Sequence, residues 1–119
     1  MNRKTLLSFL VIFNHLLEHF PVKVSFTAGE LFKDADVRER KRIVKLLTWM
    51  KEEGLIKGTI TETGISDATL TSKSLSVLLS EKKGGGIWFE EIKELVSNSS
   101  VELMERAAVE LISLLGGEK

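Results

Sequence analysis

The sequence predicts a mainly α-helical protein with a small antiparallel β-ribbon, which is a fold of the α+β class. Two observations lead to this prediction. Apolar residues recur at helical spacing in several segments, the clearest of them over residues 37–53. Residues 55–70, by contrast, are rich in threonine and isoleucine and are divided by a glycine, which is the pattern of a two-stranded ribbon.

The chain is long enough for one domain with a helical appendage, since it has 119 residues, 43% of them hydrophobic. Its formal net charge is zero, so overall charge does not argue for a nucleic-acid partner. Residues 1–83 hold 14 Lys and Arg against 10 Asp and Glu, whereas residues 84–119 hold 3 against 7. Either the two segments face different partners, or the C-terminal helices carry ordinary acidic solvent faces.

No cysteine is present, which excludes disulfides and thiolate metal sites and agrees with a cytoplasmic location. His15 and His19 have the spacing of a metal-binding pair on a helix, but no third ligand accompanies them, so we expect no metal and no cofactor. The apolar N-terminal run lacks a signal-peptide cleavage site and is too short to span a bilayer. We therefore interpret it as a core helix and expect no membrane partner.

The first helix is predicted over residues 4–20, and Pro21 ends it. Leu7 and Val11 lie outside its apolar stripe and need a second cover, either the C-terminal helices or another copy of the protein. The stripe itself, which should face the core, comprises Leu6, Phe9, Leu10, Phe13, Leu16, Leu17 and Phe20.

A short strand follows at residues 22–26, where apolar and polar residues alternate, and it should join the sheet of the ribbon. Thr27 and Glu30 have the spacing of a capping box, which predicts a short helix over residues 28–33.

The third helix is predicted over residues 37–53, with Asp36 as its N-cap and Gly54 as the residue that ends it. Arg40 falls on its apolar side, so we assign that arginine no contact. The apolar face comprises Ile43, Leu46, Leu47 and Met50, and the opposite face comprises Arg38, Lys41, Lys45 and Thr48, with Arg42 on its flank.

The ribbon is predicted from a strand over residues 55–62, a turn at Gly64 and a return strand over residues 68–70. Thr71 should cap a fourth helix, whose apolar face comprises Leu75, Leu78 and Leu79. These elements complete a predicted domain over residues 1–82. The glycines at positions 84–86 form a flexible joint to a helical pair within residues 83–119.

The C-terminal pair consists of a fifth helix over residues 87–97 and a sixth that Ser99 or Ser100 caps. The fifth presents Trp88, Phe89, Ile92, Leu95 and Val96 on one side. The sixth has a stripe of Met104, Ala107, Ala108, Leu111 and Leu115, widened by Val101, Leu103, Ile112 and Leu114. Such a wide apolar face must be buried, by folding back on the domain or by pairing with a second copy in a homodimer.

Catalysis is not expected from this sequence. It contains no nucleophile motif and no metal signature. The adjacent glutamates at positions 52–53 and 90–91 diverge by about 100° on a helix and do not converge on one substrate. We therefore predict no catalytic residues and a protein that is not an enzyme.

Binding to double-stranded DNA has a better physical basis, because a helix with several cations on one exposed face can enter a major groove. The ordinary alternative is a solvated helix face, and Glu39, Glu52 and Glu53 dilute the positive charge. The candidate DNA-binding residues are Arg38, Lys41, Arg42, Lys45 and Thr48 on the third helix, with Lys57 and Thr61 on the ribbon.

Trp49 lies on the polar side of the third helix, where an indole is seldom left in water. It should pack under the ribbon or a C-terminal helix, or belong to a partner interface. A protein-interaction module that does not bind DNA is therefore the alternative function. The candidate partner-interface residues are Trp49, Leu7, Val11, Met104 and Leu111.

Three pieces of sequence carry a family resemblance. They are the close of the third helix, Leu47-Thr-Trp-Met-Lys-Glu-Glu-Gly54-Leu55-Ile56, the ribbon with its threonines and glycine, and the run Ala68-Thr-Leu-Thr71-Ser-Lys73-Ser-Leu75. Residues 27–79 thereby resemble bacterial winged helix-turn-helix proteins, in particular transcriptional regulators of the MarR and PadR type. Two departures stand out: Ser74 occupies a position where these families usually have glycine, and the ribbon offers mainly Lys57 in place of arginine.

The resemblance implies a recognition helix over residues 36–53, a wing over residues 56–70 and a role in transcription regulation. It also implies, by analogy, that the two C-terminal helices serve dimerisation. Winged helices can also be protein-binding modules, so the fold alone does not decide between the two functions.

Overall fold

The computed structural model describes residues 2–82, 84–98 and 100–116, and within them it shows six helices and a three-stranded antiparallel sheet. The predicted α+β class is confirmed. In chain order the elements are α1 (Arg3–His19), β1 (Val24–Thr27), α2 (Ala28–Leu31), α3 (Val37–Glu52), β2 (Ile56–Ile60), β3 (Gly64–Leu70), α4 (Ser72–Leu78), α5 (Trp88–Asn98) and α6 (Val101–Gly116).

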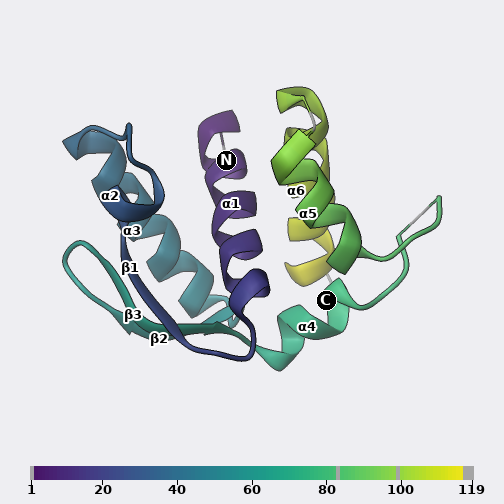
Figure 1. Ribbon diagram of the computed structural model, residues 1–119, viewed down its shortest axis with the longest axis horizontal. Coiled ribbons are helices and arrows are strands. Elements are labelled where there is room, and N and C mark those ends of the chain that lie inside the picture. The colour runs from purple at the N-terminus through teal and green to yellow at the C-terminus, as the bar shows by residue number, and fades with distance from the viewer. Residues whose placement is uncertain (1, 83, 99, 117–119) are drawn as a thin grey trace.

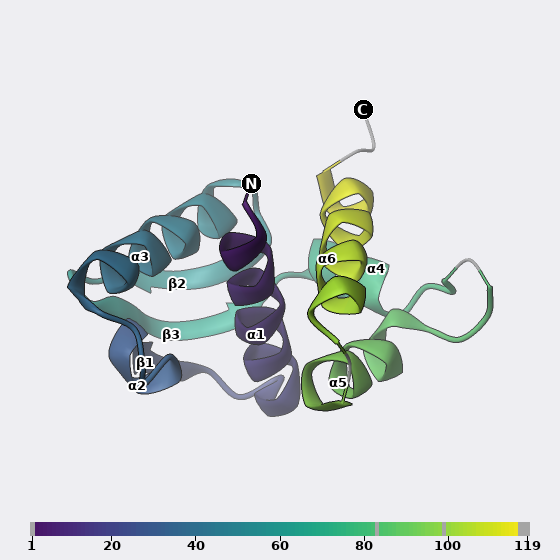
Figure 2. The same cartoon turned by 90° about the horizontal axis from the view of Figure 1, so that it is seen from above.

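Helix α1 lies at the centre of the molecule, with α3 and the sheet on one side and α5 and α6 on the other (Figures 1 and 2). Asn2 caps it by accepting a hydrogen bond from the Thr5 N–H. The predicted core stripe of α1 is buried apart from Phe20, and Ile12 is fully buried as well. Ile12 lies outside that stripe, and it is buried because α1 is covered on more than one side.

The sheet has the strand order β1-β3-β2, so the strand predicted at residues 22–26 does join the ribbon. The return strand β3 is longer than predicted, because it begins at Gly64, which the sequence placed in the turn. Gly64 pairs with Thr27 of β1, and a Cβ atom at Gly64 would lie 2.0 Å from the carbonyl oxygen of Phe26. The close approach of β1 therefore requires glycine at this position.

The predicted caps of α2 and α3 are confirmed. Thr27 and Glu30 form a reciprocal capping box at the start of α2, and Asp36 and Glu39 form a second one at the start of α3. Gly54 follows α3 with φ +76°, the left-handed conformation that favours glycine.

Helix α4 is tied to the connection between α3 and β2. The Thr71 hydroxyl donates to the Gly54 carbonyl oxygen at 2.6 Å, and the Ser74 hydroxyl donates to the Leu55 carbonyl oxygen at 2.7 Å. Ser74 is fully buried, so its hydroxyl satisfies a carbonyl oxygen that glycine at this position would leave without this partner.

Two residues assigned to core stripes are exposed instead. Phe20 is 39% exposed and Leu79 is 61% exposed, and each is the C-cap residue of its helix. Their placement was wrong because the helical period applies only up to the last helical residue, where the chain turns away.

The C-terminal helices pack against the rest of the chain. Helices α5 and α6 both contact α1, and Trp88, Ala108 and Leu111 are fully buried. Arg3 and Glu105 add a surface ion pair at 2.8 Å. Ser100 accepts a hydrogen bond from the Leu103 N–H, whereas Ser99 lies outside the described residues. Helix α6 thus folds back on its own domain, the first of the two predicted alternatives.

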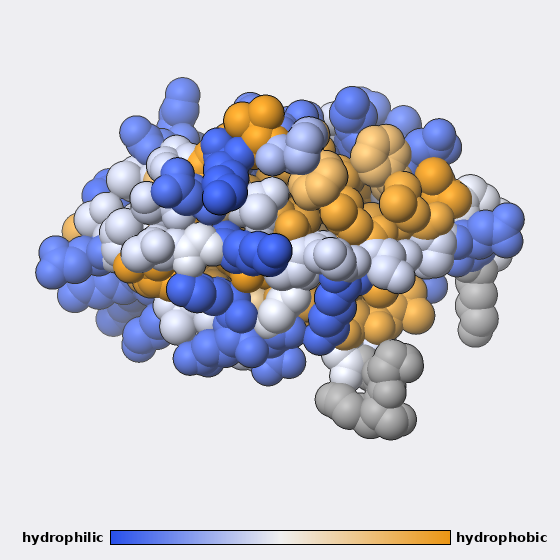
Figure 3. Space-filling view, turned by 90° about the horizontal axis from the view of Figure 1, so that it is seen from below, coloured by the Kyte–Doolittle hydropathy of each residue, from blue (hydrophilic) through white to orange (hydrophobic). Residues whose placement is uncertain are grey.

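Some apolar side chains remain at the surface. Seen from below, they gather over α4 and the adjoining part of the C-terminal half of the molecule (Figure 3). Val101, Leu103 and Leu114, which were expected to widen the buried stripe of α6, are between 43% and 48% exposed. In the part of the chain that the structure describes, no helix combines the length and hydropathy needed to cross a membrane.

Candidate nucleic-acid interface

The outer face of α3 carries three exposed cations, Arg38, Lys41 and Lys45. Their spacing of three and four residues places them along one side of the helix. Among the described residues, no carboxylate lies within 4.0 Å of any of these three side chains. The face is therefore a stripe of uncompensated positive charge, and we call it the α3 cationic face.

The opposite side of α3 fixes this orientation. Ile43, Leu46, Leu47 and Met50 are all at most 5% exposed and belong to the main hydrophobic core, as predicted. Helices α5 and α6 lie beyond α1, on the far side from α3, so they do not cover the α3 cationic face (Figures 1 and 2).

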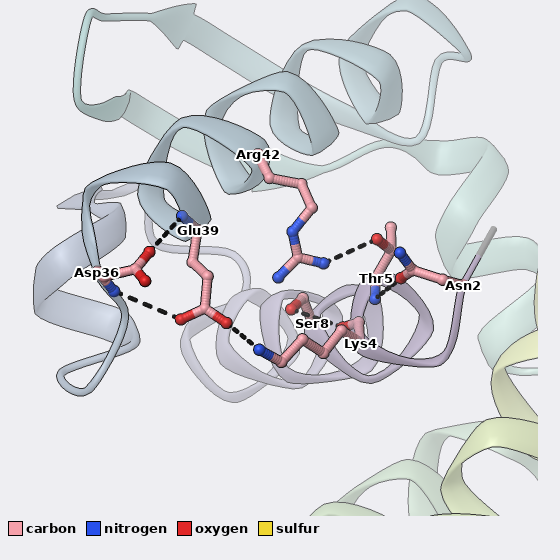
Figure 4. Close-up of polar contacts among 7 residues, drawn as sticks. All are labelled: Asn2, Lys4, Thr5, Ser8, Asp36, Glu39 and Arg42. Atoms are coloured by element: carbon pink, nitrogen blue, oxygen red, sulfur yellow. Dashed lines mark hydrogen bonds and ion pairs between the residues drawn. The ribbon is translucent and has the colours of Figure 1, made fainter.

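Arg42, at the edge of this face, is half-buried and engaged within the chain. Its guanidinium donates to the Thr5 hydroxyl of α1 at 2.9 Å (Figure 4). Only the part of the guanidinium that does not bond Thr5 can meet a ligand. Arg42 is thus in the predicted region, but it helps to hold α3 against α1.

Glu39 does not offset the α3 cationic face, because its carboxylate is already paired. It accepts a hydrogen bond from the Lys4 ammonium of α1 and another from the Asp36 N–H (Figure 4). The Lys4 hydrogen bond, followed by the Asp36 N–H, lowers the pKa of Glu39 below its ordinary 4.5. The negative charge of Glu39, which was expected to dilute the positive charge of α3, is therefore largely neutralised by Lys4 of α1.

Two further residues of α3 take part less directly. The Thr48 hydroxyl donates to the Val44 carbonyl oxygen at 3.0 Å, which leaves only its oxygen free to accept a hydrogen bond. Trp49 is half-buried and packs against the main hydrophobic core. The indole is thus covered largely by its own chain.

The tip of the β2–β3 hairpin lies beside the N-terminal half of α3. Lys57 and Thr61 are both exposed, and the Thr61 hydroxyl accepts a hydrogen bond from the Gly64 N–H, which tightens the turn. The tip of the hairpin and α3 share a hollow of about 320 Å³. Its lining comprises Thr27, Gly29, Val37, Arg40, Lys41, Val44, Glu62 and Thr63.

Arg40 is a candidate contact residue that the sequence reading did not assign. It is exposed, its Nε donates to the Ala35 carbonyl oxygen at 3.0 Å, and its side chain lies over Gly29. The helical period alone could not place it, because its neighbours are α2 and the tip of the hairpin, which pack against the start of α3 from other parts of the chain. Glu62 lines the same hollow.

The residues predicted for a partner interface lie mostly within the chain's own packing. Leu7 and Val11 are half-buried in a hollow of about 450 Å³ beside Phe32 and Ala35, so the turn after α2 provides part of their cover. Leu111 is fully buried. Met104 is half-buried and packs against the same core.

The two histidines do not form a metal centre with a third ligand. No group of three potential ligands occurs among the residues that the structure describes. The His15 ring packs edge-on against Phe26, with ring centroids 5.3 Å apart, and lies 4.8 Å from the His19 ring. Burial, followed by the neighbouring His19, lowers the pKa of His15. His15 is thereby a packing residue at the end of α1.

No protein-family model, no curated protein and no solved structure matches this chain.

Proposed function

We propose that this chain is a cytoplasmic winged helix-turn-helix protein that binds double-stranded DNA and regulates transcription. Helix α3 is the recognition helix, and the β2–β3 hairpin is the wing. The protein is not an enzyme in this proposal. The α3 cationic face enters the major groove, and the wing contacts the adjacent backbone through Lys57 and Thr61.

The proposal rests on three exposed cations, which no carboxylate of the described residues pairs, on one face of a helix whose other face is buried. Arg38 and Lys45 are seven residues apart, which is about 10 Å along a helix axis. That span lets the side chains reach several phosphates or base edges from within one groove.

The order of the elements supports the same assignment. A helix, a strand, two helices joined by a short turn and a hairpin follow one another, and the first strand pairs with the hairpin. Within this order, α3 and the hairpin correspond to the recognition helix and the wing that the resemblance of residues 27–79 implies. Lys41 of α3 and Thr63 at the tip of the hairpin line one hollow, so the proposed recognition helix and the tip of the proposed wing are neighbours.

A fluorescence-anisotropy titration with mixed-sequence duplex DNA at low salt tests the proposal. A triple variant with alanine at Arg38, Lys41 and Lys45 should bind DNA at least about tenfold more weakly, because each substitution removes an exposed charge that would lie near the phosphates. A matched control replaces Lys23, Lys93 and Arg106, three exposed cations away from α3, and should change affinity much less. Equal losses in both variants would reject the α3 cationic face as the site.

A protein-interaction module is the second candidate, favoured by the apolar side chains exposed around α4 and α6. It predicts no DNA binding even at low salt and a defined protein partner in solution. The two functions are separated by the same titration, since only the first predicts a saturable and salt-dependent signal.

A further inference from the structure

A third concave surface lies far from the α3 cationic face, at the junction of α1, α4 and α5. It has a volume of about 530 Å³, which is within the range of small-molecule sites. Its walls are mainly apolar, in keeping with the patch seen from below (Figure 3). Its lining comprises Asn14, Leu17, Glu18, Phe20, Leu75, Leu79, Phe89, Glu90 and Lys93.

Asn14 gives this hollow a polar anchor. The residue is only 9% exposed, and its Oδ1 is buried without a hydrogen-bond donor among the described residues. A buried polar atom without a partner is uncommon in folded proteins. The terminal torsion of an asparagine is broad and roughly two-fold, so a turn of about 180° exchanges the amide oxygen and nitrogen and lets either one face the hollow.

We propose that this hollow binds a small, neutral, mainly apolar molecule that carries one hydroxyl group. The apolar body covers Leu79 and Phe89, which are otherwise 61% and 44% exposed. The hydroxyl bonds Asn14, and because it both donates and accepts it can pair with either end of the amide. A neutral head group is favoured because the rim carries both signs of charge, Glu18 and Glu90 against Lys93. This site is independent of the DNA-binding proposal.

A second copy of the chain is the main competing occupant. An apolar side chain from a partner would cover Leu79 and Phe89, but it would leave the Asn14 amide without a hydrogen bond. A small hydroxylated ligand would both cover the apolar side chains and supply a hydrogen bond to Asn14. A concave surface also suits a small molecule better than it suits a flat protein interface.

Equilibrium dialysis with 2-naphthol and naphthalene tests the site, since the two probes differ by one hydroxyl. We expect 2-naphthol to bind saturably, one per chain, and about tenfold more tightly than naphthalene, as one buried hydrogen bond provides. Asn14→Leu should reduce this ratio to about one. The variant should fold, because leucine is close in size and leaves no unpaired polar atom.

Leu79→Ala should weaken both probes, whereas Leu114→Ala, at an exposed leucine outside the hollow, should weaken neither. Absence of saturable binding by either probe would overturn the proposal, and so would an unchanged ratio in Asn14→Leu. A dimer in sedimentation that Leu79→Ala converts to a monomer, without probe binding, would assign the surface to a second copy and would also overturn it.

Discussion

Gly64 shows how one missing side chain permits the central strand pairing. With Thr27 of β1 directly opposite, any Cβ at position 64 meets the Phe26 carbonyl oxygen at 2.0 Å. Gly64→Ala must push β1 away from β3, and we expect it to lower the free energy of unfolding by about 1–3 kcal/mol. Urea denaturation measures the change.

Gly29→Ala is the matched control for this substitution. Gly29 lies in α2, and the three atoms nearest to a Cβ there would belong to the Arg40 side chain, at 3.5 Å or more. Because alanine favours a helix, this variant should be neutral or more stable by up to about 1 kcal/mol. A Gly64→Ala protein as stable as Gly29→Ala would contradict the close approach of β1.

Glu39 links the start of α3 to α1, and its lowered pKa gives a pH dependence of known sign. The folded state binds a proton at Glu39 more weakly than the unfolded state does. The contribution of the Glu39 carboxylate to the free energy of unfolding is therefore present above about pH 4.5 and is lost as pH falls through the lowered pKa of the folded state. Glu39→Gln should therefore lower Tm near pH 7 and lower it less below pH 4. Thermal melts at both pH values measure this difference.

Lys4→Met provides the partner test, because Lys4 is the largest cause of the lowered pKa of Glu39. If the Lys4–Glu39 ion pair is the source of the stability, the variant with both Lys4→Met and Glu39→Gln should lose less stability at pH 7 than the sum of the losses in the two single variants. Additive losses of stability in the two single variants, or a loss of stability that is the same at low pH, would show that the Lys4–Glu39 contact does not cause the pH dependence.

At the scale of elements, α6 packs directly against α1, so we expect the two helices to unfold together. Leu111 is fully buried and Leu114, on the same helix, is 44% exposed. Leu111→Ala should cost about 2–5 kcal/mol of unfolding free energy, while Leu114→Ala should cost less than about 1 kcal/mol. Both variants should unfold in one urea transition, whereas an independent appendage would show a second transition or a negligible loss at Leu111.

The sequence predicted the elements and their order well, because the capping boxes and apolar periods are local signals. Gly54 and Thr71 were placed correctly for the same reason. The start of β3 was missed, since Asp67 has φ +55° and breaks the alternation that marks a strand. The burial of Ile12 was also missed, because four elements from distant parts of the chain, α3, β3, α5 and α6, pack around α1.

The candidate site was predictable only in part. Periodicity correctly placed Arg38, Lys41 and Lys45 on an exposed face, since their exposure follows from the buried side of one helix. The bond between Arg42 and Thr5, the neutralisation of Glu39 by Lys4, and the position of Arg40 beside the wing all depend on tertiary contacts. No pattern within α3 could have revealed them.

At the scale of the whole molecule, α1 separates two surfaces with different properties. One side carries α3 and the hairpin, and the other carries α5 and α6 (Figure 2). The hollow at Asn14 lies among residues of α1, α4 and α5. This division agrees with the unequal charges of residues 1–83 and 84–119. The proposed DNA contact therefore uses only the N-terminal side of the molecule.

The central claim is that the α3 cationic face contacts phosphates of a DNA duplex. The most direct test is the slope of log K against log salt concentration, because each phosphate contact contributes about 0.9 to that slope. The Arg38, Lys41 and Lys45 triple alanine variant should reduce the slope by about two to three relative to the unmodified chain. An unchanged slope, with binding intact, would show that the duplex is contacted elsewhere and would contradict the proposed role of α3.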